Sequence, residues 1–126
     1  MSAIATLALV VPDYDRAIAF FVGGLGFILL QDLDQGTRRW VRVAPAGGGA
    51  ALLLAKAEGP RQMAAIGDQA GGRVFLFLET DDFDRDAARI SAAGGVFEEP
   101  PRDEPYGRVA VWRDPFGNRW DLIEPA

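Results

Sequence analysis

The sequence contains neither cysteine nor histidine. Without cysteine the chain has no disulfide, no thiolate metal ligand and no thiol nucleophile, and a reducing cytoplasm is its expected location. Without histidine it lacks the commonest general base at neutral pH and the commonest ligand for zinc, nickel and iron. These two absences remove most of the side chains with which proteins hold transition metals.

Long apolar runs and basic clusters are also missing. No window reaches the roughly 20 apolar residues of a membrane span, and the N-terminus lacks the basic flank of a signal sequence, so we expect no membrane partner. Of 126 residues, 18 are acidic and 13 basic, and the basic ones are scattered apart from the pair Arg38 and Arg39. Nucleic acid is not an expected partner, because binding to phosphates needs clustered positive charge. Length and apolar content fit one domain, residues 1–126.

The two halves of the chain can be aligned with each other. Asp13–Arg16 (DYDR) matches Asp82–Arg85 (DFDR), and in each half the first aspartate follows a strand-like run and is placed to cap a helix. Three further strand-like runs, with a turn containing Pro and Gly, follow each helix. This order predicts two βαβββ modules, residues 4–56 and 73–124, joined by a linker at residues 57–72.

The predicted elements are short. In the first module we expect a strand at 4–11, a helix at 14–22 and strands at 28–33, 40–43 and 50–55. In the second module we expect a strand at 74–78, a helix at 83–93 and strands at 96–99, 108–113 and 119–123. A short helix is expected near Pro60 in the linker, and the proline-rich segment 98–106 is expected to be an extended loop with solvated acids.

Three ordered motifs resemble the vicinal oxygen chelate superfamily, which includes glyoxalase I, extradiol dioxygenases, fosfomycin-modifying enzymes and bleomycin-resistance proteins. They are 11–21 (VPDYDRAIAFF) with LGF at 25–27, 80–84 (TDDFD) with AAG at 92–94, and 113–124 (RDPFGNRWDLIE). The resemblance covers nearly the whole chain. It implies an α+β fold in which two tandem βαβββ modules form a curved, cup-like mixed sheet around a cavity for a small ligand. It also suggests a homodimer.

Metal enzymes of that superfamily usually take their ligands from the first and last strands of each module. The corresponding positions here are Thr6 and Phe75 in the first strands, Asp121 in the last strand of the second module, and Ala51, or Leu53 with a two-residue slip, in the first module. Only Asp121 is a good ligand, and one carboxylate does not make a metal site. The resemblance therefore implies a member without a metal or another cofactor.

Strand alternation suggests which side chains line the cavity. If Val41 and Val43 face the helices, then Trp40 and Arg42 face the cavity, and the same alternation in the second module points Trp112 inward. The candidate ligand-binding residues are Thr6, Trp40, Arg42, Phe75, Phe77, Trp112 and Asp121. Such a lining is aromatic with few polar groups, which suits a flat, partly apolar molecule.

Each of these assignments has an alternative. Asp121 lies near Arg108, Arg113 and Arg119 in the sequence, so it is either a hydrogen-bond acceptor for a ligand or an ion-paired sheet residue. The aromatic residues either line the cavity or fill the core or a dimer contact.

The sequence favours a metal-free protein that binds a small, partly aromatic organic molecule, as bleomycin-resistance proteins sequester their drug, and we assign no catalytic residue. The alternative is a metal-dependent lyase or isomerase of the glyoxalase type, or a dioxygenase, with ligands such as Glu79 or ligands from a partner chain. A third reading is a metal-independent enzyme that uses Asp121 or Glu79 as its base.

Overall fold

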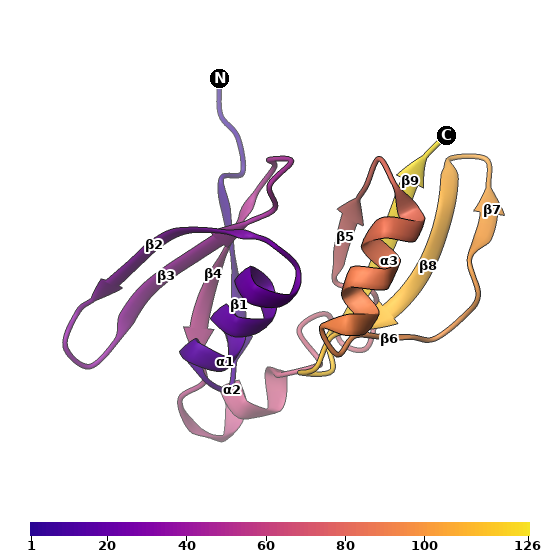
Figure 1. Ribbon diagram of the computed structural model, residues 1–126. Coiled ribbons are helices and arrows are strands. Elements are labelled where there is room, and N and C mark those ends of the chain that lie inside the picture. The colour runs from indigo at the N-terminus through magenta and orange to yellow at the C-terminus, as the bar shows by residue number, and fades with distance from the viewer. The chain divides into compact units, whose positions relative to one another are not determined.

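The computed structural model describes residues 1–126 and divides into two compact units, Met1–Ala65 and Ile66–Ala126. In each unit the helix that follows the first strand lies against one face of that unit's own sheet (Figure 1). The α+β class and the repeated βαβββ order predicted from the sequence are confirmed. None of the helices is both long and apolar enough to cross a membrane.

The first unit contains a four-stranded sheet with the order β1-β4-β3-β2. Its elements are β1 (Thr6–Val11), α1 (Tyr14–Ile18), the π-helix η1 (Ala19–Gly24), β2 (Ile28–Asp34), β3 (Arg39–Ala44), β4 (Ala51–Lys56) and α2 (Gly59–Ala65). Strands β1 and β4 are parallel, and the other neighbours are antiparallel. Helix α2 lies in the segment where the sequence predicts a short connecting helix.

The second unit repeats this arrangement with the strand order β5-β9-β8-β6. Its elements are β5 (Leu76–Glu79), α3 (Phe83–Ala92), β6 (Val96–Phe97), β7 (Arg102–Glu104), β8 (Gly107–Arg113) and β9 (Arg119–Pro125). The first and last strands, β5 and β9, are again parallel, and β7 is an extra strand paired with β8. The segment expected to be a proline-rich loop therefore contributes a strand.

The matching aspartates begin the two helices as the repeat predicts. The carboxylate of Asp13 accepts a hydrogen bond from the Arg16 backbone N–H at 2.8 Å, and that of Asp82 accepts one from the Arg85 N–H at 3.1 Å. Each bond satisfies a backbone donor that has no partner within the helix. The same local chemistry therefore starts both helices.

The first helix changes its winding midway, which differs from the single α-helix expected at 14–22. It becomes a π-helix over residues 19–24, and the Leu25 N–H donates to the Phe20 carbonyl five residues earlier, at 2.9 Å. Phe20 and Phe21 are both buried, with ring centroids 5.0 Å apart. The wider turn brings two consecutive aromatic side chains into the core.

The core of each unit lies between the helix and the sheet. In the second unit the indoles of Trp112 and Trp120 stack with centroids 4.9 Å apart, close to Ile90 of α3. The first unit buries aliphatic strand residues under the helix side chains of Ala17, Phe20 and Phe21. These strand residues are Leu9, Val11, Val41, Val43, Leu52 and Leu54.

The orientation predicted for Trp112 is wrong. Its side chain is fully buried, and a Cβ added at Gly95 would lie 3.1 Å from the Trp112 ring and 2.5 Å from the Ile90 side chain, so Trp112 packs on the helix side of the sheet. Val111 instead lies opposite Asp121 on the other face. Alternation alone could not show which face of β8 packs against the helix, because the side chains on both faces are mainly apolar. Placing the Trp112 indole on the helix side removes more apolar area from water than placing Val111 there.

Candidate functional site

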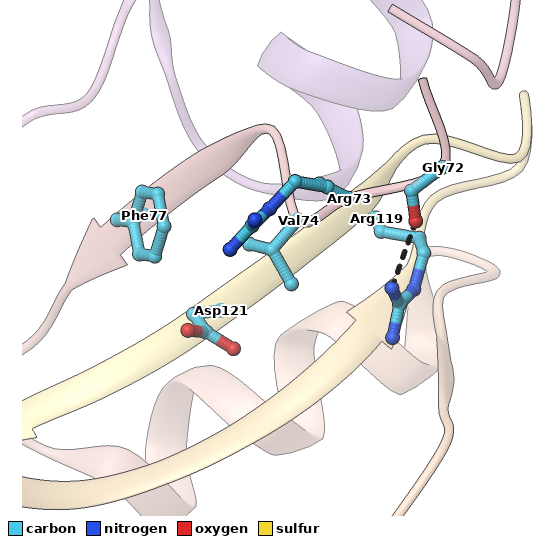
Figure 2. A pocket seen from close by; sticks show the side chains of 6 residues that line it. All are labelled: Gly72, Arg73, Val74, Phe77, Arg119 and Asp121. Carbon is cyan, nitrogen blue, oxygen red and sulfur yellow. Dashed lines mark hydrogen bonds between the residues drawn. The ribbon is translucent and has the colours of Figure 1, made fainter. Parts of the chain in front are cut away.

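A pocket of about 560 Å³ lies on the sheet face of the second unit that is opposite α3. It is lined by Gly72, Arg73, Val74, Phe77, Arg119 and Asp121 (Figure 2). Phe77 and Asp121 are register partners on the parallel strands β5 and β9, so their side chains emerge from the same face of the sheet. Two of the residues predicted from the sequence are therefore brought together here.

Asp121 is the unusual member of this pocket. Asp121 is only 9% exposed. Its Oδ1 atom is buried and accepts no hydrogen bond. Burial raises the pKa of Asp121 above its ordinary value, and the charge of Glu99 contributes to the rise, while Arg102 and Arg119 act in the opposite direction. Burying a carboxylate oxygen without a hydrogen-bond donor lowers the stability of the fold. The burial of Asp121 is therefore not explained by a contribution to stability.

The arginines near Asp121 in the sequence have other partners. Arg119 pairs with Glu98 at 2.9 Å and donates to the Gly72 carbonyl at 3.0 Å. Arg113 also pairs with Glu98, at 3.4 Å, and Arg108 pairs with Asp84 at 3.5 Å. The ion-paired interpretation of Asp121 is therefore not what the structure shows.

Arg73 differs from these arginines because its guanidinium forms no ion pair. It is exposed, and its side chain extends beside Val74 toward the ring of Phe77 (Figure 2). The pocket thus combines a free cation, an unpartnered carboxylate and an aromatic ring that is 63% exposed. The sequence analysis missed Arg73, which precedes β5 and has no pattern that marks it.

Phe75 is placed differently from Phe77. Its backbone N–H donates to the Arg119 carbonyl at 2.9 Å, ahead of the first residue of β5, and its side chain is half-buried. It is not among the residues that line the pocket.

The first unit brings together the three candidate residues that it contains. Arg42 donates from Nε to the Thr6 hydroxyl at 3.2 Å and from a terminal nitrogen to Gln31 Oε1 at 3.0 Å. The Trp40 indole N–H donates to the same Gln31 oxygen at 2.9 Å. One amide therefore holds an indole and a guanidinium on one face of the sheet.

Gln31 was missed because a β-bulge interrupts the alternation of β2. Leu29 pairs with Val43 and Gln31 pairs with Arg42, which leaves Leu30 as an extra residue between them. A bulge moves all later side chains to the other face, and nothing in the apolar run of this strand marks its position. The sequence could place Trp40 and Arg42 but not the residue that joins them.

Glu99 was also missed, because its segment was expected to be a solvated loop. Its carboxylate accepts a hydrogen bond from the Val111 N–H at 2.8 Å and pairs with Arg102. The Val111 hydrogen bond, together with Arg102, holds the pKa of Glu99 below its usual range. Glu99 thus keeps a negative charge near Asp121 and pairs with Arg102, a cation that acts on Asp121.

The donor set does not fit a metal ion. No group of three or more histidine, cysteine, aspartate or glutamate side chains is placed to hold one. In the pocket, Asp121 is accompanied by Arg73 and Arg119, whose positive charges oppose a cation. Thr6, in the first unit, offers only a hydroxyl, which is a poor neutral ligand.

Comparison with known proteins agrees with the fold and the motifs. The family model of the glyoxalase/bleomycin resistance protein/dioxygenase superfamily matches residues 3–122, and the chain belongs to this superfamily. An uncharacterized protein from Shewanella frigidimarina (strain NCIMB 400) is 52% identical over 124 residues, which cover 96% of this chain and 92% of that protein.

Two solved structures from Streptomyces sp. CB03234 are each 33% identical to this chain. TnmS3, an antibiotic binding protein, has a TM-score of 0.79, covering 100% of this chain and 98% of its own. A glyoxalase/bleomycin resistance protein has a TM-score of 0.74, covering 97% of this chain and 100% of its own. The fold predicted from the resemblance is therefore confirmed.

Proposed function

We propose that this protein binds a small, partly aromatic organic molecule in the Asp121 pocket and acts by binding. The observation that carries the proposal is the pairing of Phe77, an exposed ring, with Asp121, a buried carboxylate whose Oδ1 accepts no hydrogen bond, on one pocket wall. A ligand that covers the ring and donates to the carboxylate satisfies both groups at once.

The size and chemistry of the pocket support this proposal. A volume of about 560 Å³ lies within the usual range for small-molecule sites. Phe77 provides a flat apolar surface, and the charged side chains of Arg73, Arg119 and Asp121 around it can orient a ligand. The likeness to TnmS3, which is an antibiotic binding protein, supports the same class of function for this chain.

We also propose that Thr6, Trp40 and Arg42, which lie together on the sheet of the first unit, contact a ligand there. The Gln31 amide fixes the indole and the guanidinium side by side, so a ring that stacks on either meets an ordered surface. Ordering these long side chains before binding reduces the entropy that a ligand must overcome.

The binding proposal is tested by measuring melting temperature and native mass with 2-naphthol and 4-hydroxybenzoate as probes. We expect at least one probe to bind the wild-type protein and to raise its melting temperature. Phe77→Ala should abolish the shift, whereas Val96→Ala, which truncates an equally exposed apolar side chain outside the pocket, should retain it. Absence of any shift with the wild-type protein contradicts the proposal.

Elemental analysis of untagged protein tests the competing metal-dependent reaction. We expect no stoichiometric transition metal and no loss of probe binding in chelator. About one metal ion per chain, removed by chelation together with a lyase, isomerase or dioxygenase activity, contradicts a role in binding alone.

We further propose a homodimer, as the family resemblance suggests. Strand β2 is at the edge of its sheet and carries four exposed apolar side chains, Ile28, Leu29, Leu30 and Leu33. Exposed apolar edge strands are usually covered. Sedimentation should show a dimer that Leu33→Lys weakens and Ile4→Lys, at an exposed site outside the strand, leaves intact; a wild-type monomer contradicts this proposal.

A further inference from the structure

We propose that the Asp121 pocket selects an aromatic hydroxy acid, a ring that carries a hydroxyl donor for Asp121 and an anionic group for Arg73. This inference rests on the proposed binding function and specifies the ligand class. Three independent features of the pocket lead to it: the missing donor at Asp121, the unpaired charge at Arg73 and the exposed ring of Phe77.

The Asp121 oxygen requires a donor from outside the protein. No side chain of the pocket donates to it: Arg119 is occupied by Glu98 and the Gly72 carbonyl, and Arg73 forms no ion pair with Asp121. The charges of Arg102 and Arg119 already act on Asp121 and favour its ionised form. A neutral hydroxyl therefore suffices as the donor, and a cationic group on the ligand would be repelled by the arginines.

Arg73 is free to pair with an acceptor on a ligand. Its guanidinium offers five N–H donors in a plane, which match the two oxygens of a carboxylate. Arg119 does not compete for this role, since its charge is balanced by Glu98. The positive charge that remains to be balanced by a ligand in the pocket is that of Arg73.

Phe77 provides the apolar surface on which the ring of the ligand stacks. The Arg73 side chain extends toward Phe77, and the Asp121 carboxylate faces the same pocket from β9 (Figure 2). A ring stacked on Phe77 presents its two substituents along its own plane, one toward each charged side chain. The proposed ligand class follows from this arrangement of ring, acceptor and cation.

The test is calorimetric titration of three matched probes. 4-Hydroxybenzoate carries both groups, 4-methoxybenzoate lacks the hydroxyl donor, and 4-hydroxybenzamide lacks the negative charge. We expect the first to bind about tenfold or more tightly than either of the others. Equal binding of the three overturns this inference and leaves the proposed function standing. Absence of binding by all three also overturns this inference, and it contradicts the proposed function only if 2-naphthol does not bind either.

Variants assign each preference to its residue. Arg73→Met should remove the preference for the acid over the amide while keeping the preference for hydroxyl over methoxy, and Arg73→Lys should restore the first. Asp121→Leu should remove the preference for hydroxyl over methoxy while keeping the preference for the acid over the amide. Arg73 is exposed and forms no ion pair, so its replacement tests the inference without threatening the fold. Preferences unchanged by both Arg73→Met and Asp121→Leu overturn the assignment.

Discussion

Phe77 and Asp121 are register partners on β5 and β9, yet the phenyl ring is 63% exposed and the carboxylate is only 9% exposed. This distribution is the reverse of the usual one, in which apolar rings are buried and carboxylates are hydrated. Proteins keep such costly arrangements mainly where they bind or react. The pair therefore lies at the part of the sheet that we propose as the ligand site.

Replacing Asp121 should stabilise the ligand-free protein. Asp121→Leu removes a buried carboxylate oxygen that has no donor, and the adjoining pocket has space for the larger side chain. We expect the free energy of unfolding in urea to rise by about 1–3 kcal/mol. Asp103→Leu, at an exposed position of β7, is the control and should not stabilise. A loss of stability in Asp121→Leu would contradict the strain assigned to this residue.

The stability gained in Asp121→Leu should depend on pH. Because burial raises the pKa of Asp121 in the folded state, the folded wild-type protein binds more protons than the unfolded chain between the two pKa values. The wild-type protein therefore loses stability, relative to the variant, as pH rises from about 4 through the folded pKa. Urea unfolding across this range should show the difference growing with pH and reaching its smallest value in acid. A constant difference would mean that Asp121 does not titrate abnormally.

Much of the fold could be predicted because the same order of elements occurs twice in the sequence. The aspartates Asp13 and Asp82 each cap a helix through a local hydrogen bond, and a local interaction can be recognised from sequence. The order of the elements along the chain followed from the repeat of the whole unit. The packing of an apolar strand such as β8 could not be predicted in the same way. The face on which Trp112 lies depends on its contacts with residues of the helix, which the strand's own sequence does not show.

Only some of the residues of the candidate site could be predicted from the sequence. Phe77, Trp40 and Arg42 follow from alternation along regular strands, and Asp121 follows from the resemblance of its motif to the superfamily. Gln31 does not, because a bulge in β2 changes the face on which it lies. Arg73, Glu98 and Glu99 lie outside the predicted pattern of site residues, and their importance comes from contacts across the sheet that no sequence period records.

Asp114 is a second buried carboxylate, and it should behave in the opposite way to Asp121. It is 4% exposed and accepts hydrogen bonds from the Trp120 indole at 3.0 Å, the Asn118 amide at 2.9 Å, and the backbone N–H groups of Phe116 and Asn118. Asp114→Ala leaves these donors without an acceptor, so we expect a loss of about 3 kcal/mol or more in urea unfolding.

Asp103→Ala is the matched control for Asp114→Ala. Asp103 is exposed, and its replacement should change the free energy of unfolding by about 0.5 kcal/mol or less. Similar effects of the two substitutions would show that the network around Asp114 does not stabilise the turn between β8 and β9.

Trp112 should matter for stability and not for ligand contact. Its ring stacks on Trp120 within the core, so Trp112→Phe leaves a cavity and should cost about 2 kcal/mol in urea unfolding. Calorimetric affinity for a bound probe, measured where both proteins are fully folded, should be unchanged. Phe77→Ala should show the converse behaviour, and a direct loss of affinity in Trp112→Phe with normal stability would restore this residue to the site.

The most direct measurement is a solution NMR titration of labelled protein with 4-hydroxybenzoate, followed through the backbone amides. The account predicts saturable shifts centred on residues 72–77 and 119–121, and their loss in Phe77→Ala. Spectra that stay unchanged at millimolar probe, or shifts confined to residues away from these two segments, would contradict it.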